Sequence, residues 1–164
     1  MVLPDKDHVA RTCKASSLDG PTGRPTPASF AFRPGDDGNW KDTYLSVNWL
    51  EHLLPADVDL PAKFAKLREF LAAPHEYQVM KPTKTSVLAA IRVSAIHTAP
   101  VEAVATVLQC HYEPEGEDDP HSGIHPSPGV EHWPTLGDAP EHLAIQQYLF
   151  QAVCHIEPAF LPPV

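Results

Sequence analysis

The chain has 164 residues, with 19 prolines, 3 cysteines and 10 histidines, and its formal net charge is −9. This length fits one domain over 1–164, and no apolar run approaches the about 20 residues that a membrane-spanning helix needs. The first residues also lack the apolar core of a signal peptide, so we expect a cytoplasmic protein with reduced thiols at Cys13, Cys110 and Cys154.

The charge is unevenly distributed along the chain. Arg92 is the last basic residue, so residues 93–164 hold 10 Asp and Glu residues and no Lys or Arg, together with 7 of the 10 histidines. Such a segment repels phosphate and is therefore a poor nucleic-acid surface. A basic protein surface or a bound cation would complement it.

The N-terminal part of the chain predicts short strands separated by loops. An ordered segment at 8–13 leads into a loop at about 14–27, which is punctuated by Gly and Pro. Residues 28–33 predict a strand that forms a hairpin with 44–47 across a long turn.

Two helix signals follow. Asn48 and Glu51 have the spacing of a capping box for a short helix. A longer helix is predicted over 61–73, with Asp59 as its cap and Pro74 as its end. Its apolar side chains recur at helical spacing and are Leu60, Phe64, Leu67 and Leu71.

The second half predicts two apolar segments, a loop and a helix. Residues 86–97 and 101–110 contain Ile, Val and Thr, which favour strands, although their alanines leave a helix open as the alternative. A long loop at about 111–137 leads to a helix at 139–153, and a Pro-rich tail follows at 158–164. Together the elements predict an α+β fold, in which the two main helices pack on a small, mainly antiparallel sheet.

The loop at 111–137 is rich in metal-binding side chains. Loops of this length are usually functional or disordered, and imidazole with carboxylate suits Zn²⁺ or Mn²⁺. His121 and His125 lie four residues apart between Pro120 and Pro126, which restrict the backbone. The alternative is a solvated acidic loop whose histidines point separately into water. The candidate ligands are His111, Asp118, Asp119, His121, His125 and His132.

Three residues are candidates for catalysis: His8, Arg11 and His121. His8 and Arg11 belong to the segment Asp7-His8-x-x-Arg11, which brings an acid, a base and a cation together, although a surface ion pair would have the same pattern. The sequence has no G-x-S-x-G elbow, P-loop or G-x-G-x-x-G motif. It therefore lacks the familiar marks of an α/β-hydrolase or a nucleotide site.

Three segments resemble features of a group of small uncharacterised bacterial proteins. They are Asp7-His8-Val9-x-Arg11, Leu45-Ser46-Val47-Asn48-Trp49-Leu50-Glu51 and Asp119-Pro120-His121-Ser122-Gly123-Ile124. The resemblance implies a bacterial source and no particular activity. It singles out five polar positions, which are His8, Arg11, Ser46, Asn48 and His121.

Two functions of different classes fit these features. The first is a hydrolase-like or divalent-metal-binding domain whose site lies on the 111–132 loop, joined by His8 and Arg11, with a metal-activated water as its nucleophile. The second is a non-catalytic partner whose acidic C-terminal half binds a basic surface on another protein. Polar groups that converge in one place favour the first, and dispersed ones favour the second.

Overall fold

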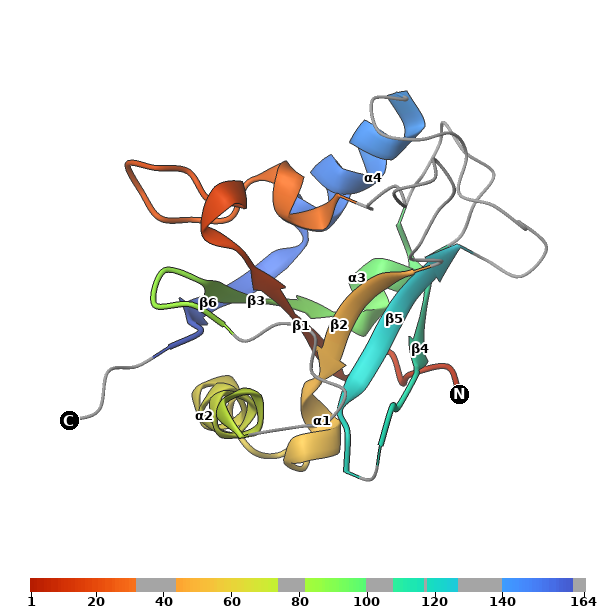
Figure 1. Cartoon of the computed structure of the whole chain (residues 1–164). Coiled ribbons are helices and arrows are strands. Elements are labelled where there is room, and N and C mark those ends of the chain that lie inside the picture. Colours follow the sequence, from red (N-terminus) through yellow and green to blue (C-terminus); the bar gives the residue numbers. More distant parts are fainter. Residues whose placement is uncertain (32–43, 74–81, 100–107, 117, 127–139, 161–164) are drawn as a thin grey trace.

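The described part of the fold is built on one antiparallel sheet of six strands, in the order β4-β5-β2-β1-β3-β6 (Figure 1). With two longer helices, it is an α+β fold, as the sequence predicts. The strands are β1 (His8–Cys13), β2 (Leu45–Trp49), β3 (Val87–Arg92), β4 (Leu108–Tyr112), β5 (His121–Pro126) and β6 (Val153–Pro158). The computed structural model describes residues 1–31, 44–73, 82–99, 108–116, 118–126 and 140–160.

Strand β1 lies inside the sheet and has unequal neighbours. It pairs with β3 along all of His8–Cys13, but with β2 only at Val9 and Ala10. Beyond Ala10 the two strands separate, so the backbone groups of β2 that face β1 there need hydrogen-bond partners other than β1. This separation matters for the site, because Arg11 lies at the point where it begins.

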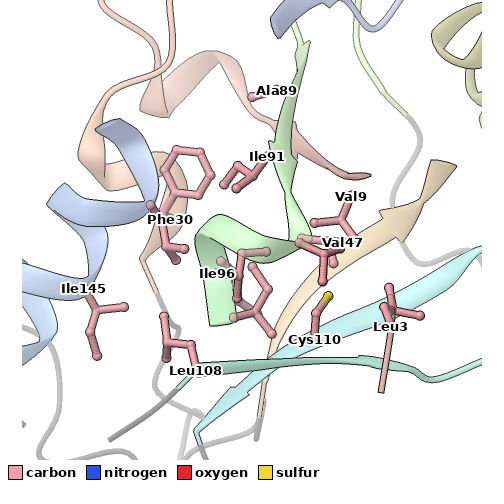
Figure 2. Close-up of a cluster of buried hydrophobic side chains, with 14 of the residues drawn as sticks. Leu3, Val9, Phe30, Val47, Ala89, Ile91, Ile96, Leu108, Cys110 and Ile145 are labelled. Atoms are coloured by element: carbon pink, nitrogen blue, oxygen red, sulfur yellow. The ribbon is translucent and has the colours of Figure 1, made fainter. Parts of the chain in front are cut away.

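One face of the sheet packs against three helices: the 3-10 helix η2 (Pro27–Phe30), α3 (Val93–His97) and α4 (Pro140–Gln151). Side chains alternate between the faces of a strand, so alternate residues of β1, β2 and β4 lie on this side. They include Val9, Cys13, Val47 and Cys110, which are buried in what we call the first core. Figure 2 shows Val9, Val47 and Cys110 on the sheet side, with Phe30, Ile96 and Ile145 from the three helices packed near them.

The opposite face carries α1 (Leu50–Leu53) and α2 (Leu60–Ala72), seen below the sheet in Figure 1. Asp59 caps α2 as predicted, because its carboxylate accepts a 2.9 Å hydrogen bond from Ala62 N. Phe64 and Leu67 of α2 are fully buried in a second core, against Leu88 of β3 and its neighbours. This burial confirms that the apolar side of the helix, as predicted, faces the sheet. Burial of each such side chain contributes roughly 1.5–3 kcal/mol.

Two predicted strands are partly helical. Residues 27–30 form η2 in place of the strand predicted at 28–33, since Pro27 at the first helical position favours a helical turn. Strand β3 ends at Arg92, and 93–97 form α3, where Val93 N donates to Asp7 O at 2.9 Å instead of joining a ladder. Parts of the predicted strands, 32–33 and 101–107, lie outside the described residues.

The pairing of β2 also differs from the prediction. No hairpin joins 28–31 to 44–47 in the described chain, because β2 lies between β1 and β5. The predicted loop at 111–137 begins with the end of β4 and contains β5, and these two strands form a hairpin. Residues 127–137 lie outside the described part.

The predicted helix at 139–153 is found as α4, but the chain then continues as a strand. Strand β6 pairs with β3 through Ala89 and Ile156, so the expected Pro-rich tail begins inside the sheet. Pro158 is compatible with this position because it ends an edge strand. No helix within the described ranges is long and apolar enough to cross a membrane.

The two edges of the sheet differ. Strand β4 forms one edge, and the start of the chain lies along it: Leu3 N donates to Cys110 O at 2.8 Å, and Tyr112 N donates to Met1 O at 2.9 Å. Strand β6 forms the other edge, and no described strand pairs with its outer side.

Candidate functional site

Polar side chains gather on the face of the sheet that also carries α2. Helix α2 packs over β1 and β3 there, whereas β2, β5 and β4 present a row of hydroxyl, amide and imidazole groups on the same side. The row follows from alternation, because the intervening residues of these strands point into the first core. We call this set the polar face, and its members are Tyr44, Ser46, Asn48, Gln109, His111, His121, Gly123 and His125.

Ser46 and His121 form a hydrogen-bonded pair on the polar face. Ser46 is exposed on β2, and its Oγ lies 3.0 Å from Nε2 of His121 on β5. The other ring nitrogen, Nδ1, lies 2.8 Å from the backbone carbonyl of Glu113. A carbonyl can only accept, so Nδ1 carries the proton, and in the neutral ring Nε2 accepts the hydrogen bond from the Ser46 hydroxyl.

Arg11 binds the backbone of the same serine. Its Nη1 donates to Ser46 O at 2.6 Å, and its Nε donates to Ser29 O at 3.2 Å. The bond from Nη1 gives the Ser46 carbonyl a partner in the part of β2 that no longer pairs with β1, and the bond from Nε ties the same guanidinium to η2. Arg11 therefore fixes the backbone that carries the Ser46 hydroxyl, and it places a cation beside that strand.

Two further histidines lie next to this pair. The rings of His111 and His125 are 5.1 Å apart, and Tyr44 contacts both His125 and His121, at 4.8 and 5.7 Å between ring centroids. Gly123 permits the close packing, since a Cβ at this position would lie 2.5 Å from Tyr44 Cδ2. The structure thus brings His111, His121 and His125 together on one face, joined by Tyr44.

His111 and His125 favour the neutral state. Burial lowers the pKa of both rings, and the Glu113 carboxylate partly offsets this effect. The N-terminal ammonium and His97 lower the pKa of His111 further, and His111 lowers that of His125. His125 Nε2 lies 3.2 Å from Glu113 Oε1, but this buried nitrogen makes no hydrogen bond to a described residue. The two rings are therefore uncharged groups around neutral pH.

The remaining predicted metal ligands do not join them. Asp118 lies exposed at the β4–β5 turn, and the buried Asp119 accepts hydrogen bonds from the backbone of Glu115 and His121, at 2.8 and 3.0 Å. Asp119 thereby shapes the turn that precedes β5. His132 lies outside the described residues. Over the described ranges, no group of three or more His, Cys, Asp or Glu side chains is arranged to hold a metal ion.

His8 belongs to a different cluster. Its Nδ1 and the buried Lys63 Nζ both contact Glu51 Oε1, at 3.0 and 2.8 Å, and its backbone N donates to Glu51 Oε2 at 2.7 Å. Burial alone would raise the pKa of Glu51, but the hydrogen bonds from His8 and Lys63 outweigh it and lower the pKa to about 2. This cluster joins α1, α2 and β1, so the structure gives His8 a place in the packing of these elements.

Neither of two hollows on the described surface contains the Ser46–His121 pair. One, of about 460 Å³, lies between the 19–27 loop, the end of α4 and β6. The other, of about 400 Å³, lies beside His52, Phe70 and Asp118. The pair instead lies on the surface of the sheet, where Ser46 is exposed.

Comparison with known proteins gives no match: no family model, no curated protein and no solved structure matches this chain. The geometry of the polar face is therefore the basis for any functional conclusion.

Sequence reasoning named His121 and Arg11 but could not connect them to Ser46. The contact depends on the β2–β5 register, in which Ser46 lies opposite Gly123 and Asn48 opposite His121. No local pattern specifies which strands become neighbours. The alternation of Leu45, Ser46 and Val47 was the available signal, because it places Ser46 on the face away from the core.

Proposed function

We propose that the polar face is the active site of a serine-dependent hydrolase, with Ser46 as the nucleophile and His121 as its general base. The proposal rests on one observation: Ser46 Oγ lies 3.0 Å from an imidazole nitrogen whose opposite nitrogen is bound to a carbonyl. A nucleophile, a base within hydrogen-bond reach and a third group that orients the base are the parts that acyl transfer needs.

The reaction follows from these contacts. Ser46 Oγ attacks the carbonyl carbon of an ester or similar acyl compound, and its proton passes to His121 Nε2. The proton then moves to the leaving group as the bond to the acyl carbon breaks, which leaves an ester on Ser46. Water then attacks this ester while the same nitrogen takes its proton. That proton passes to Ser46 Oγ as the bond between this oxygen and the acyl carbon breaks, which releases the acid and restores the hydroxyl. The Glu113 carbonyl accepts the hydrogen bond from Nδ1 and so keeps the imidazolium that forms in both steps in its orientation.

The experiment uses a fluorophosphonate, which phosphonylates activated serines, followed by peptide mass spectrometry. We expect one adduct, on Ser46, and none in Ser46→Ala. His121→Gln should slow labelling by about 10²–10⁴-fold, the usual contribution of a general base. Ser16→Ala is the matched control, since Ser16 is an exposed serine in the 3-10 helix η1 (Ala15–Ser17) and lies away from the polar face.

Other outcomes would contradict the proposal. Labelling that is absent, or that occurs equally in His121→Gln, would show that Ser46 is not activated by His121. A hydrolytic activity that is lost with a chelator and restored by Zn²⁺ or Mn²⁺, and that survives Ser46→Ala, would favour the divalent-metal hypothesis over the serine nucleophile.

The uneven charge supports a second candidate function, a non-catalytic protein that binds a basic surface. Residues 93–164 carry 10 acidic side chains and no Lys or Arg. An interface of this kind would weaken steeply as salt is added, because surface charges are screened. Binding to a basic protein that is insensitive to salt would argue against it.

A further inference from the structure

One edge of the sheet, formed by β6, has no partner strand among the described residues. Unpaired edge strands present backbone N–H and C=O groups that can extend the sheet with another strand. The start of the chain covers the β4 edge, whereas β6 has no described partner on its outer side. Of the two edges, β6 is thus the one whose outward backbone groups are available to pair with another strand.

The direction of the backbone groups of β6 follows from its pairing with β3. Ala159 N donates to Ser86 O at 2.9 Å, and the register pairs Leu88 with Glu157 and Ala89 with Ile156. In an antiparallel ladder, hydrogen-bonded pairs alternate with non-bonded ones. Glu157 therefore faces β3 with its backbone groups, and Ile156 directs its N–H and C=O outward.

We propose that β6 pairs with β6 of a second copy of this chain, antiparallel and with a two-fold axis at Ile156. Each Ile156 N–H then donates to the C=O of the partner's Ile156, and the sheet continues across both copies. The contact is isologous, since the same strand supplies both sides. Pro158 lacks an N–H, which limits the pairing to a short stretch around the axis.

Charge complementarity favours a second copy over an unrelated strand. In this register His155 of one copy lies opposite Glu157 of the other, twice. Both residues lie on the α2 side of the sheet: the His155 ring packs 5.3 Å from the Phe64 ring, and Glu157 accepts a 2.7 Å hydrogen bond from Arg68. His155 and the Glu157 opposite it form a pair without backbone hydrogen bonds, and in antiparallel sheets the side chains of such pairs lie closest together. The imidazole of each copy therefore lies next to the Glu157 carboxylate of the other.

The other face of the edge is apolar. There the hollow of about 460 Å³ is bordered by Val153 and Ile156 of β6, Phe150 of α4 and Pro25 and Pro27 of the preceding loop. Phe160, just beyond β6, is 37 % exposed. Pairing of two copies places apolar side chains around the axis opposite each other, which adds hydrophobic burial to the two backbone hydrogen bonds.

The first test compares Ile156→Pro with Ile156→Val by sedimentation equilibrium of the full chain. Proline removes an N–H that points away from β3, so the ladder within each copy keeps its bonds. We expect the parent and Ile156→Val to dimerise, with a dissociation constant at least tenfold higher for Ile156→Pro. Monomers at all concentrations up to the millimolar range, or equal dimerisation of Ile156→Pro and the parent, would overturn the proposal.

The second test uses the charge pairs. His155→Glu sets acidic residues opposite each other in its homodimer, and Glu157→Lys sets cationic ones opposite His155. In a heterodimer of the two variants, one contact pairs a glutamate with a lysine and the other keeps the imidazole opposite a carboxylate. We expect each variant alone to dimerise less than the parent and the mixture to form heterodimers, measured by native mass spectrometry. Equal homodimer and heterodimer formation would reject this register, and thermal melting of each variant checks that it is folded.

Discussion

At the scale of single residues, the buried Lys63 ammonium depends on the Glu51 carboxylate to balance its charge. The Lys63 side chain is 2 % exposed and that of Glu51 6 %, and their charged atoms are 2.8 Å apart. Removing one partner leaves the other charge buried without compensation. We expect Glu51→Gln to lower the free energy of unfolding at pH 7 by about 3–5 kcal/mol, measured by urea denaturation. Glu69→Gln, which breaks the exposed pair with Lys66, should cost less than about 1 kcal/mol.

The same carboxylate predicts a pH dependence. The pKa of Glu51 is about 2 in the folded protein, below its ordinary value of 4.5, so the ionised form stabilises the fold. This contribution, roughly 3 kcal/mol, is present above pH 4.5 and is lost as the pH falls toward 2. The stability gap between the parent and Glu51→Gln should therefore narrow over that range. A gap that stays constant from pH 5 to pH 2 would contradict the assignment.

Leu67 tests the packing of α2. It is fully buried in the second core, against β1 and β3. We expect Leu67→Ala to cost about 2–5 kcal/mol in the free energy of unfolding, because a large cavity replaces the side chain. Lys66→Ala, at the neighbouring exposed position, should stay within about 0.5 kcal/mol. Similar losses in the two variants would show that the helix presents another face to the sheet.

At the scale of elements, Gly123 reports on how β5 packs at the polar face. A Cβ at this position would lie 2.7 Å from both Tyr44 Cγ and His125 Nε2, so both rings have to move. We expect Gly123→Ala to destabilise the protein by roughly 1–3 kcal/mol, as overpacking does. If the proposed activity depends on the arrangement of this face, fluorophosphonate labelling should fall as well. Unchanged stability would mean that Tyr44 is not held over Gly123.

Elements with local signals were predictable from the sequence, and those defined by distant partners were not. Asp59, Pro61 and the apolar spacing determine α2 within its own segment. By contrast, β6 is a strand because β3 pairs with it, and its Cys, His, Glu and Pro give no strand pattern. Residues 93–97 are apolar enough for a strand, but bonds to the segment before β1 turn them into α3.

For the candidate site, too, the local features were predictable from the sequence and the contacts between distant strands were not. Clustered histidines in the sequence indicated a polar region, and the structure places His111, His121 and His125 on one face. Their assignment to a loop was wrong, because β4 and β5 pair as a hairpin there. The contact between Ser46 and His121, on which the proposed role of Ser46 rests, follows from strand order, which composition and spacing do not encode.

At the scale of the whole molecule, both cores share one sheet. Leu88 and Ala90 of β3 face the second core, while Ala89 and Ile91 face the first. If either core unfolds, one face of β3 becomes exposed to solvent and the strand loses packing that the other core also needs. We therefore expect one cooperative unfolding transition. Far-ultraviolet circular dichroism and tryptophan fluorescence should give coincident curves, and Leu67→Ala should shift both equally. Two separated transitions would show that the cores unfold independently.

The strand order also has a kinetic consequence. Val9 pairs with Ile91, Leu45 with Ile124 and Ala89 with Ile156, whereas the β4–β5 hairpin joins near neighbours in the chain. Chains dominated by such distant pairings must close large loops before they gain contacts, and they fold in milliseconds to seconds. We expect stopped-flow refolding in this range, with the β4–β5 hairpin as the earliest ladder protected from hydrogen exchange. Until the distant strands meet, unpaired edges stay exposed, so refolding yield should fall as protein concentration rises.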